Sequence, residues 1–204
     1  MTTLLVIAKA PVPGRVKTRL TPPFSPDEAA ALAEAALRDT LDAVCAAPAT
    51  RRVLALEGAP GPWLPPGVEV VPQRGRGLDE RIAAALAGIS GPVLLVGMDT
   101  PQLTPHHLRV SWDNHDAWFG PAADGGFWAL GLRQSDPARV LGVPMSRGDT
   151  GAHLRARLTG LRVGELPTLT DVDTAADATA VAAAGPTTRF ARLHARLALA
   201  TGRV

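Results

Sequence analysis

Short apolar runs alternate along this chain with longer segments in which alanine and leucine recur at helical spacing. The runs that the pattern predicts as strands are Leu4–Ala8, Val53–Leu56, Val68–Val71, Val93–Gly97, Ala117–Phe119 and Phe127–Leu132. The segments that it predicts as helices are Pro26–Ala46, Leu78–Ile89, Pro105–Trp112, Asp149–Leu158, Thr174–Ala184 and Thr188–Thr201. Strands that alternate with helices are typical of a mostly parallel sheet with helices on both faces. The sequence therefore predicts an α/β fold, with Phe127–Leu132 as a hairpin or mixed strand after its Gly-Gly turn.

Three of these helices carry a start signal. Ser25 precedes a proline and has Glu28 three residues later, which is the pattern of a capping box. Thr174 with Asp177 repeats that spacing, and Thr104 stands as an N-cap before another proline. We therefore expect helices to begin directly after Ser25, Thr104 and Thr174.

Length and composition fit one globular domain. The 204 residues, 46% of them hydrophobic, can bury a full α/β core, and we predict a single domain over residues 1–204. The formal net charge is only +2, and the pI of 9.3 arises because nearly all basic residues are arginine. No lysine- or arginine-rich run occurs, and aromatic residues do not interleave with arginines as they do in nucleic-acid-binding proteins. We therefore expect no nucleic-acid partner.

The N-terminus indicates a strand rather than a signal peptide. Met1–Ile7 lacks a charged segment ahead of its apolar residues and runs into a Pro/Gly loop. No apolar stretch reaches the roughly 18 residues of a membrane span. The one cysteine, Cys45, excludes an internal disulfide. We expect a cytoplasmic protein whose C-terminal amphipathic helix packs on the core, with a homodimer contact as the second interpretation.

The first candidate site follows the first predicted strand, in the loop Lys9–Leu20. The only two lysines of the chain, Lys9 and Lys17, lie here together with Arg15, Arg19 and a glycine, Gly14. Cations and backbone amides at the carboxyl end of a strand suit a di- or triphosphate. The spacing is not that of a P-loop. The alternative interpretation is a solvated basic loop.

A second candidate is Asp99, which follows the predicted strand Val93–Gly97. One carboxylate at such a strand end suits Mg²⁺ or Mn²⁺, ions that take one or two carboxylates together with phosphate oxygens and water. Asp171 and Asp173 form a later pair whose i, i+2 spacing on an extended segment points both carboxylates the same way. The alternative for Asp99 is a turn cap, and for the pair it is capping of the next helix.

A third candidate is the turn Asp124-Gly125-Gly126. Two glycines after an aspartate let the backbone approach a ligand closely, although the same pattern also marks an ordinary hairpin. Other chemistry lacks support in the sequence. The five histidines show no metal-ligand spacing, and no G-x-S-x-G motif occurs.

Taken together, these segments resemble the DUF2064 family. The resemblance spans nearly the whole chain and is carried by Lys9–Leu20, Gln73–Arg81, Gly97–Pro105, Gly120–Phe127 and Asp171–Asp177. That family is usually labelled glycosyltransferase-A-like, or radical-SAM/selenodomain-associated transferase 1. It is more distantly similar to nucleotidyltransferases that make molybdopterin guanine dinucleotide or activate phospholactate. The resemblance implies a Rossmann-like fold of the nucleotide-diphosphosugar transferase type.

The resemblance also implies roles for individual residues. Gly14, Lys17 and Arg19 match a phosphate loop, Asp99 matches a metal-binding aspartate, Asp124–Gly126 match an acceptor-side turn, and Asp171 and Asp173 match a late acidic motif. Two departures concern the acceptor. The tyrosine-rich pair that usually follows the double glycine is here Phe127-Trp128, and Ser111–Asp116 is idiosyncratic.

The resulting hypothesis is a metal-dependent transferase. Its donor is a nucleotide sugar or an NTP, its acceptor is a small molecule, and Lys17, Asp99 and Asp124 are its catalytic residues. Glycosyl transfer agrees with the label of the family, whereas the two cations of the loop suit nucleotidyl transfer with release of pyrophosphate. A non-catalytic nucleotide-binding module is the alternative from another class. The hypothesis requires Lys17 and Asp99 to meet at one cleft.

Overall fold

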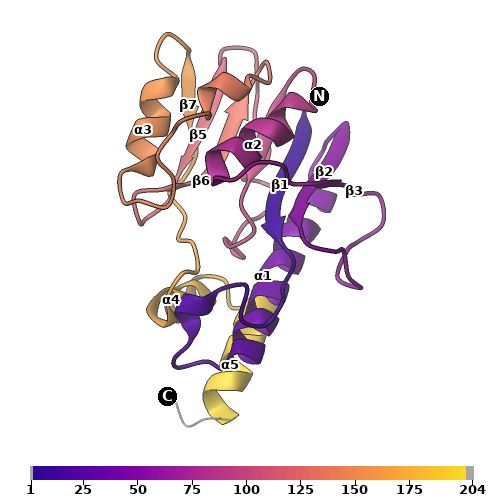
Figure 1. The fold of residues 1–204 in the computed structure, drawn as a ribbon, viewed down its shortest axis with the longest axis vertical. Helices are drawn as coiled ribbons and strands as arrows, with labels where there is room; N and C mark the ends of the chain where they lie inside the picture. The colour runs from indigo at the N-terminus through magenta and orange to yellow at the C-terminus, as the bar shows by residue number, and fades with distance from the viewer. Residues whose placement is uncertain (1, 201–204) are drawn as a thin grey trace.

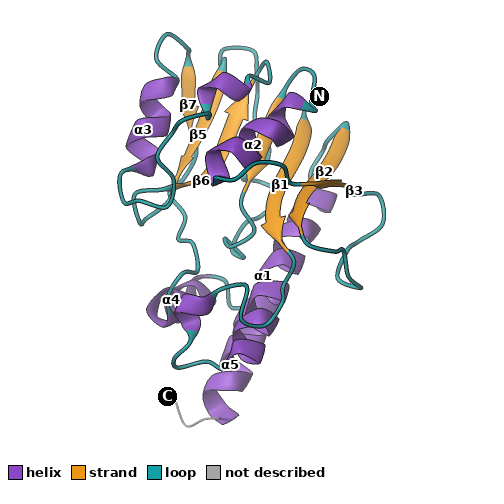
Figure 2. Cartoon of the chain, viewed as in Figure 1, coloured by secondary structure: helices purple, strands orange, loops and turns teal. Residues whose placement is uncertain are grey.

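The computed structural model describes residues 2–200, and these form a seven-stranded sheet in the order β3-β2-β1-β4-β6-β5-β7 (Figures 1 and 2). The strands are β1 (Thr3–Lys9), β2 (Arg51–Glu57), β3 (Glu69–Pro72), β4 (Val93–Val96), β5 (Ala117–Pro121), β6 (Phe127–Leu132) and β7 (Val163–Glu165). The helices are α1 (Pro26–Ala46), α2 (Leu78–Ala87), α3 (Thr150–Arg157), α4 (Ala175–Ala184) and α5 (Arg189–Ala200), with short 3₁₀ turns η1 (Thr18–Leu20) and η2 (Pro137–Arg139). The predicted α/β architecture is confirmed.

Strand direction creates the edge of the sheet on which the candidate residues meet. β6 is antiparallel to both β4 and β5, whereas every other pair of neighbouring strands is parallel. The carboxyl ends of β1 and β4 therefore lie at the same edge as the amino end of β6. The expectation of a mostly parallel sheet with a reversed strand at Phe127–Leu132 is confirmed.

Alternating side chains of the strands supply two hydrophobic cores, one on each face of the sheet. Leu4 and Val6 of β1 pack toward α1, while Leu5 points to the opposite face, which α2 and α3 cover. This division follows from the two-residue period of a strand. Helices thus cover both faces, as the sequence predicts.

A third core holds the helices that extend beyond the sheet in Figure 1. Leu32 and other residues of α1 pack there against Val181 of α4 and Phe190 of α5. Arg189 at the start of α5 forms ion pairs with Asp39 and Asp42 of α1. The C-terminal helix therefore packs against the rest of the chain, as expected, and its predicted last residue, Thr201, lies outside the described residues.

Capping explains where two helices begin. Ser25 caps α1 and Thr174 caps α4, each in a reciprocal capping box with Glu28 and Asp177 respectively. Both predictions from the sequence are confirmed. None of the helices in residues 2–200 combines the length and the apolar character that crossing a bilayer requires.

One prediction of secondary structure is wrong, and one strand was not predicted. The helix expected at Pro105–Trp112 is a series of turns, in which His107 N donates to Thr104 O and Arg109 N donates to His106 O, each at 3.1 Å. The strand β7 escaped prediction because its three residues, Val163–Glu165, include a single apolar side chain.

Candidate active site

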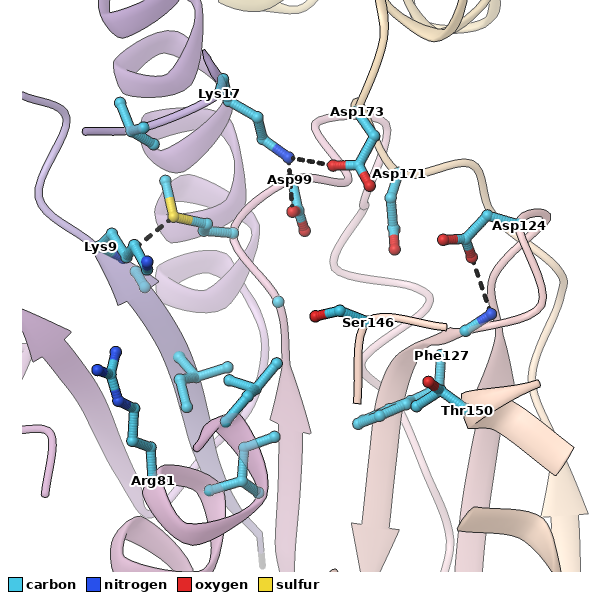
Figure 3. Close-up of a pocket in the computed structure, with 18 of the residues that line it drawn as sticks. Lys9, Lys17, Arg81, Asp99, Asp124, Phe127, Ser146, Thr150, Asp171 and Asp173 are labelled. Carbon is cyan, nitrogen blue, oxygen red and sulfur yellow. Dashed lines mark hydrogen bonds and ion pairs between the residues drawn. The ribbon is translucent and has the colours of Figure 1, made fainter. Parts of the chain in front are cut away.

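A cleft of about 730 Å³ opens at the carboxyl ends of β1 and β4 (Figure 3). That volume lies within the range of small-molecule sites. The charged residues that line it are the cations Lys9, Arg15, Lys17, Arg19, Arg76, Arg81 and Arg147 and the carboxylates Asp99, Asp124, Asp171 and Asp173. Residues far apart in the sequence thus form one densely charged cavity.

Lys17 lies at the centre of the acidic side of this cleft. Its Nζ donates to Oδ2 of Asp99 at 2.7 Å and to Oδ1 of Asp173 at 2.9 Å, and only 9% of its side chain is exposed. Burial opposes the charged form, but the two carboxylates outweigh it and raise the pKa of Lys17. The Lys17 side chain therefore stays protonated and positively charged.

The backbone explains how these side chains converge. Lys17 has a left-handed conformation (φ 48°) at the start of η1, which turns its side chain across the cleft. Asp99 follows β4, and its carbonyl oxygen accepts a hydrogen bond from Val172 N at 2.9 Å. Because Val172 is buried and the segment is extended, its neighbours Asp171 and Asp173 both face the cleft. The hydrogen bond between Val172 N and Asp99 O thereby keeps the carboxylates of Asp99, Asp171 and Asp173 close together.

Asp171 forms no ion pair within residues 2–200, although the Lys17 charge acts on it from a distance. Its Oδ1 is buried and has no hydrogen-bond partner. Burial, together with the charges of Asp99 and Asp124, raises the pKa of Asp171 to about 8. A buried carboxylate oxygen without a donor is a suitable ligand for a cation. This observation fits the Mg²⁺ or Mn²⁺ that the sequence predicts.

The coordination set is nevertheless incomplete. Within residues 2–200, no group of three or more carboxylate, histidine or cysteine side chains stands ready to hold a metal ion by itself. Lys17 occupies the oxygens of Asp99 and Asp173 that face it. The predicted set of Asp99, Asp171 and Asp173 is therefore not preformed, which agrees with ions that take substrate oxygens and water as further ligands.

The Asp124-Gly125-Gly126 turn is built for packing as well as for the cleft. Asp124 Oδ1 accepts a hydrogen bond from Gly126 N at 2.8 Å, and both residues line the cleft. Gly125 (φ +87°) does not line it and packs directly against the backbone of Gly148. Gly14 (φ +73°) likewise does not line the cleft, and its positive φ allows the turn in the loop that follows β1.

The opposite side of the cleft is basic. Lys9 at the end of β1 lies 3.4 Å from Glu57, which also pairs with Arg81 of α2. Gln73 donates both side-chain N–H groups to carbonyl oxygens, of Ala8 at 2.8 Å and of Ala55 at 3.0 Å. Lys9 was predicted at this site from the sequence, and Arg81 closes the segment Gln73–Arg81, which also carries the resemblance to the family.

The start of α3 forms a wall that the sequence analysis missed. Ser146, Arg147 and Thr150 line the cleft, and in Figure 3 the Ser146 side chain points into it. Ser146 has a φ of 58°, and together with Lys17 it makes up the non-glycine residues with positive φ in residues 2–200. Strained backbone of this kind gathers at functional sites. No sequence pattern marks Ser146, which is an exposed serine in a loop.

Comparison with known sequences identifies the family. The sequence pattern of the family described as "Uncharacterized protein conserved in bacteria (DUF2064)" matches residues 31–147, more than half of the chain. This chain belongs to the DUF2064 family. Asp99 and Asp124 lie within the matched part of this DUF2064 protein, whereas Lys17, Asp171 and Asp173 lie outside it. No curated protein sequence matches the chain at a significant level.

Solved structures share the fold of this DUF2064 protein. A protein of Desulfovibrio desulfuricans G20, provisionally assigned as a nucleotide-diphospho-sugar transferase, is 26% identical with a TM-score of 0.83, over 97% of this chain and 94% of that one. Rv0371C of Mycobacterium tuberculosis H37Rv, in complex with manganese, is 23% identical (TM-score 0.56, 88% and 97% covered). The 2-C-methyl-D-erythritol 4-phosphate cytidylyltransferase of Thermus thermophilus is 17% identical (TM-score 0.53, 92% and 100% covered). The fold is therefore that of nucleotide-diphosphosugar transferases.

Proposed function

We propose that this protein is a nucleotide-dependent transferase whose donor polyphosphate lies across the part of the loop that lines the cleft, from Arg15 to Arg19. The observation that carries the proposal is the meeting of Lys17 with Asp99 and Asp173 at 2.7 and 2.9 Å in one cleft. A cationic loop beside a carboxylate cluster is the arrangement that a polyphosphate bound with a divalent cation requires.

Asp99 and Asp171 would hold the cation, Mg²⁺ or Mn²⁺, with Asp173 as a third carboxylate. When bound, such an ion neutralises phosphate oxygens and stabilises the charge that develops on the leaving group. Rv0371C, crystallised with manganese, supports this choice of ion. The unpartnered Oδ1 of Asp171 supplies the structural reason.

The side chains of this protein bind and orient the substrates. Arg15, Lys17 and Arg19 neutralise the phosphates, which lowers the cost of charge build-up on the leaving group. In Figure 3, Asp124 lies on the side of the acidic cluster that is farthest from Lys17. From there it would accept a hydrogen bond from the incoming acceptor group. The mechanism is direct attack of the acceptor on the donor and needs no protein nucleophile.

Glycosyl transfer from a nucleotide sugar to a small-molecule acceptor is the first form of this proposal. The similarity to the Desulfovibrio desulfuricans protein, the highest in identity of those compared above, supports it. Nucleotidyl transfer is the second form. The three cations Arg15, Lys17 and Arg19 on one wall of the cleft favour it, because they suit a triphosphate better than a diphosphate.

Product analysis separates these forms. We would incubate the protein and Mn²⁺ or Mg²⁺ with NTPs or nucleotide sugars and candidate acceptors, and measure pyrophosphate and nucleoside diphosphate. Nucleoside diphosphate released from nucleotide sugars supports glycosyl transfer, and pyrophosphate released from NTPs supports nucleotidyl transfer. Metal-dependent binding without release of either product identifies a non-catalytic nucleotide-binding module, and absence of binding refutes the proposal.

A further inference from the structure

The carboxylates proposed to hold a cation are already engaged by Lys17. Its ammonium contacts Asp99 Oδ2 and Asp173 Oδ1, while the Oδ1 atom of Asp171 remains without a donor. Figure 3 shows Lys17 reaching these aspartates from the loop that precedes α1. Two of the oxygens that a cation from solution would need are thus already in contact with a cation of the protein.

Both cations are unfavourable together unless negative charge is added. A divalent ion on Asp99 and Asp173 would lie next to the Lys17 ammonium, and like charges a few ångströms apart repel strongly inside a partly buried cleft. The phosphates of a nucleotide supply the missing negative charge. The lysine stem, with four carbons and three rotatable donors, allows the ammonium to change partners without a change of fold.

We propose that Lys17 occupies the cation position in the nucleotide-free protein and moves to the phosphates when nucleotide binds. This inference rests on the proposed function, because it takes a polyphosphate and a divalent ion as ligands. It makes their binding cooperative: nucleotide draws Lys17 away and frees Asp99 and Asp173. Linkage requires the reverse as well, so that the ion raises nucleotide affinity by the same factor.

The first test measures Mn²⁺ binding without nucleotide by isothermal titration calorimetry. We expect Lys17→Met, which removes the competing charge and keeps the stem, to bind Mn²⁺ about five- to a hundredfold more tightly than the unmodified protein. Lys9→Met is the matched control. Its amine lies in the same cleft but pairs with Glu57, so we expect no such tightening. Weaker or unchanged Mn²⁺ binding by a folded Lys17→Met protein overturns the proposal.

A second measurement follows Lys17 in the unmodified protein, and a variant is needed only to assign the signals. The sequence contains two lysines, so ¹³Cε-lysine labelling gives one NMR signal for each, assigned with Lys9→Met. We expect Mg²⁺ with a non-hydrolysable nucleotide analogue to shift the Lys17 signal more than Mg²⁺ alone does. A Lys17 signal that stays in place while the nucleotide binds refutes the exchange.

The two proposals fail separately. If neither NTPs nor nucleotide sugars bind in the presence of metal, the proposed function fails, whereas the calorimetry without nucleotide still reports on the competition between Lys17 and the ion. If nucleotide binds but Mn²⁺ affinity is insensitive to Lys17, only the exchange is wrong.

Discussion

The carbonyl oxygen of Gly148 lies 1.9 Å from the position that a Cβ atom on Gly125 would occupy. Two loops that meet at the cleft, one before β6 and one before α3, are therefore in direct backbone contact. Gly151 N reinforces the contact by donating to Gly125 O at 2.8 Å. The loop that contains Gly125 cannot shift without moving the loop that contains Gly148. The position of Asp124, which precedes Gly125, therefore depends on this contact.

We expect Gly125→Ala to destabilise the protein by more than about 2 kcal/mol, since strain at positive φ adds to a backbone clash. The matched control is Gly160→Ala. Gly160 has nearly the same φ, +86° against +87°, but a Cβ there meets no atom within 4 Å. Its loss should be limited to about 1–2 kcal/mol from the backbone angle alone. Urea unfolding measures both, and equal losses would show that the contact with Gly148 is unimportant.

Removal of a phosphate-facing charge should weaken nucleotide binding in proportion to the number of phosphates. Arg19 is 72% exposed, and its nearest carboxylate, Asp173, lies 3.6 Å away, so its guanidinium is available to a ligand. We expect Arg19→Ala to lower triphosphate affinity about tenfold or more, and monophosphate affinity less, because a charge-assisted hydrogen bond is lost. Fluorescence titration of both ligands measures the ratio. Arg192→Ala, which removes an exposed arginine from α5, should leave it unchanged.

Loss of the Asp99 carboxylate should uncouple nucleotide from metal. We expect Asp99→Asn to abolish most of the increase in nucleotide affinity that Mn²⁺ produces, because a neutral amide is a poor ligand for a hard cation and Lys17 loses a partner. Thermal-shift titration with and without Mn²⁺ measures the effect. Asp113→Asn, at an exposed carboxylate whose partner is Ser111, is the control. An Asp99→Asn protein that keeps its metal dependence would place the ion elsewhere.

Acid should destabilise the protein through His107. Burial, with the charge of His106 adding to it, lowers the pKa of His107 below its ordinary value. The unfolded chain then binds the proton more readily. The contribution of neutral His107, which accepts a hydrogen bond from Thr104, is therefore complete above about pH 6.5 and is lost as the pH falls below it.

Denaturant unfolding from pH 8 to pH 5 tests this prediction. We subtract the unfolding free energy of His107→Gln from that of the unmodified protein. This difference should stay constant above about pH 6.5 and decrease as the pH falls below it. The comparison cancels other groups that titrate in this range, such as Asp171. A difference that does not vary with pH would show that His107 titrates alike in the folded and unfolded states.

Local patterns predicted much of the fold because they depend on neighbouring residues. The capping boxes at Ser25 and Thr174 and the apolar runs of β1 and β4 are physical signals within a few positions. The same reasoning failed at Pro105–Trp112, where the cap signal at Thr104 is followed by turns rather than a helix.

The sequence by itself determined which groups this protein offers: two lysines early in the chain, aspartates at predicted strand ends, and a parallel sheet that brings such ends together. Only the tertiary structure decided which atoms meet. The pairing of Lys17 with Asp173 spans 156 positions, and the contact of Gly125 with Gly148 joins two separate loops. Contacts of this kind are set by how the sheet orders its strands and how the loops pack above it, and no local spacing encodes either.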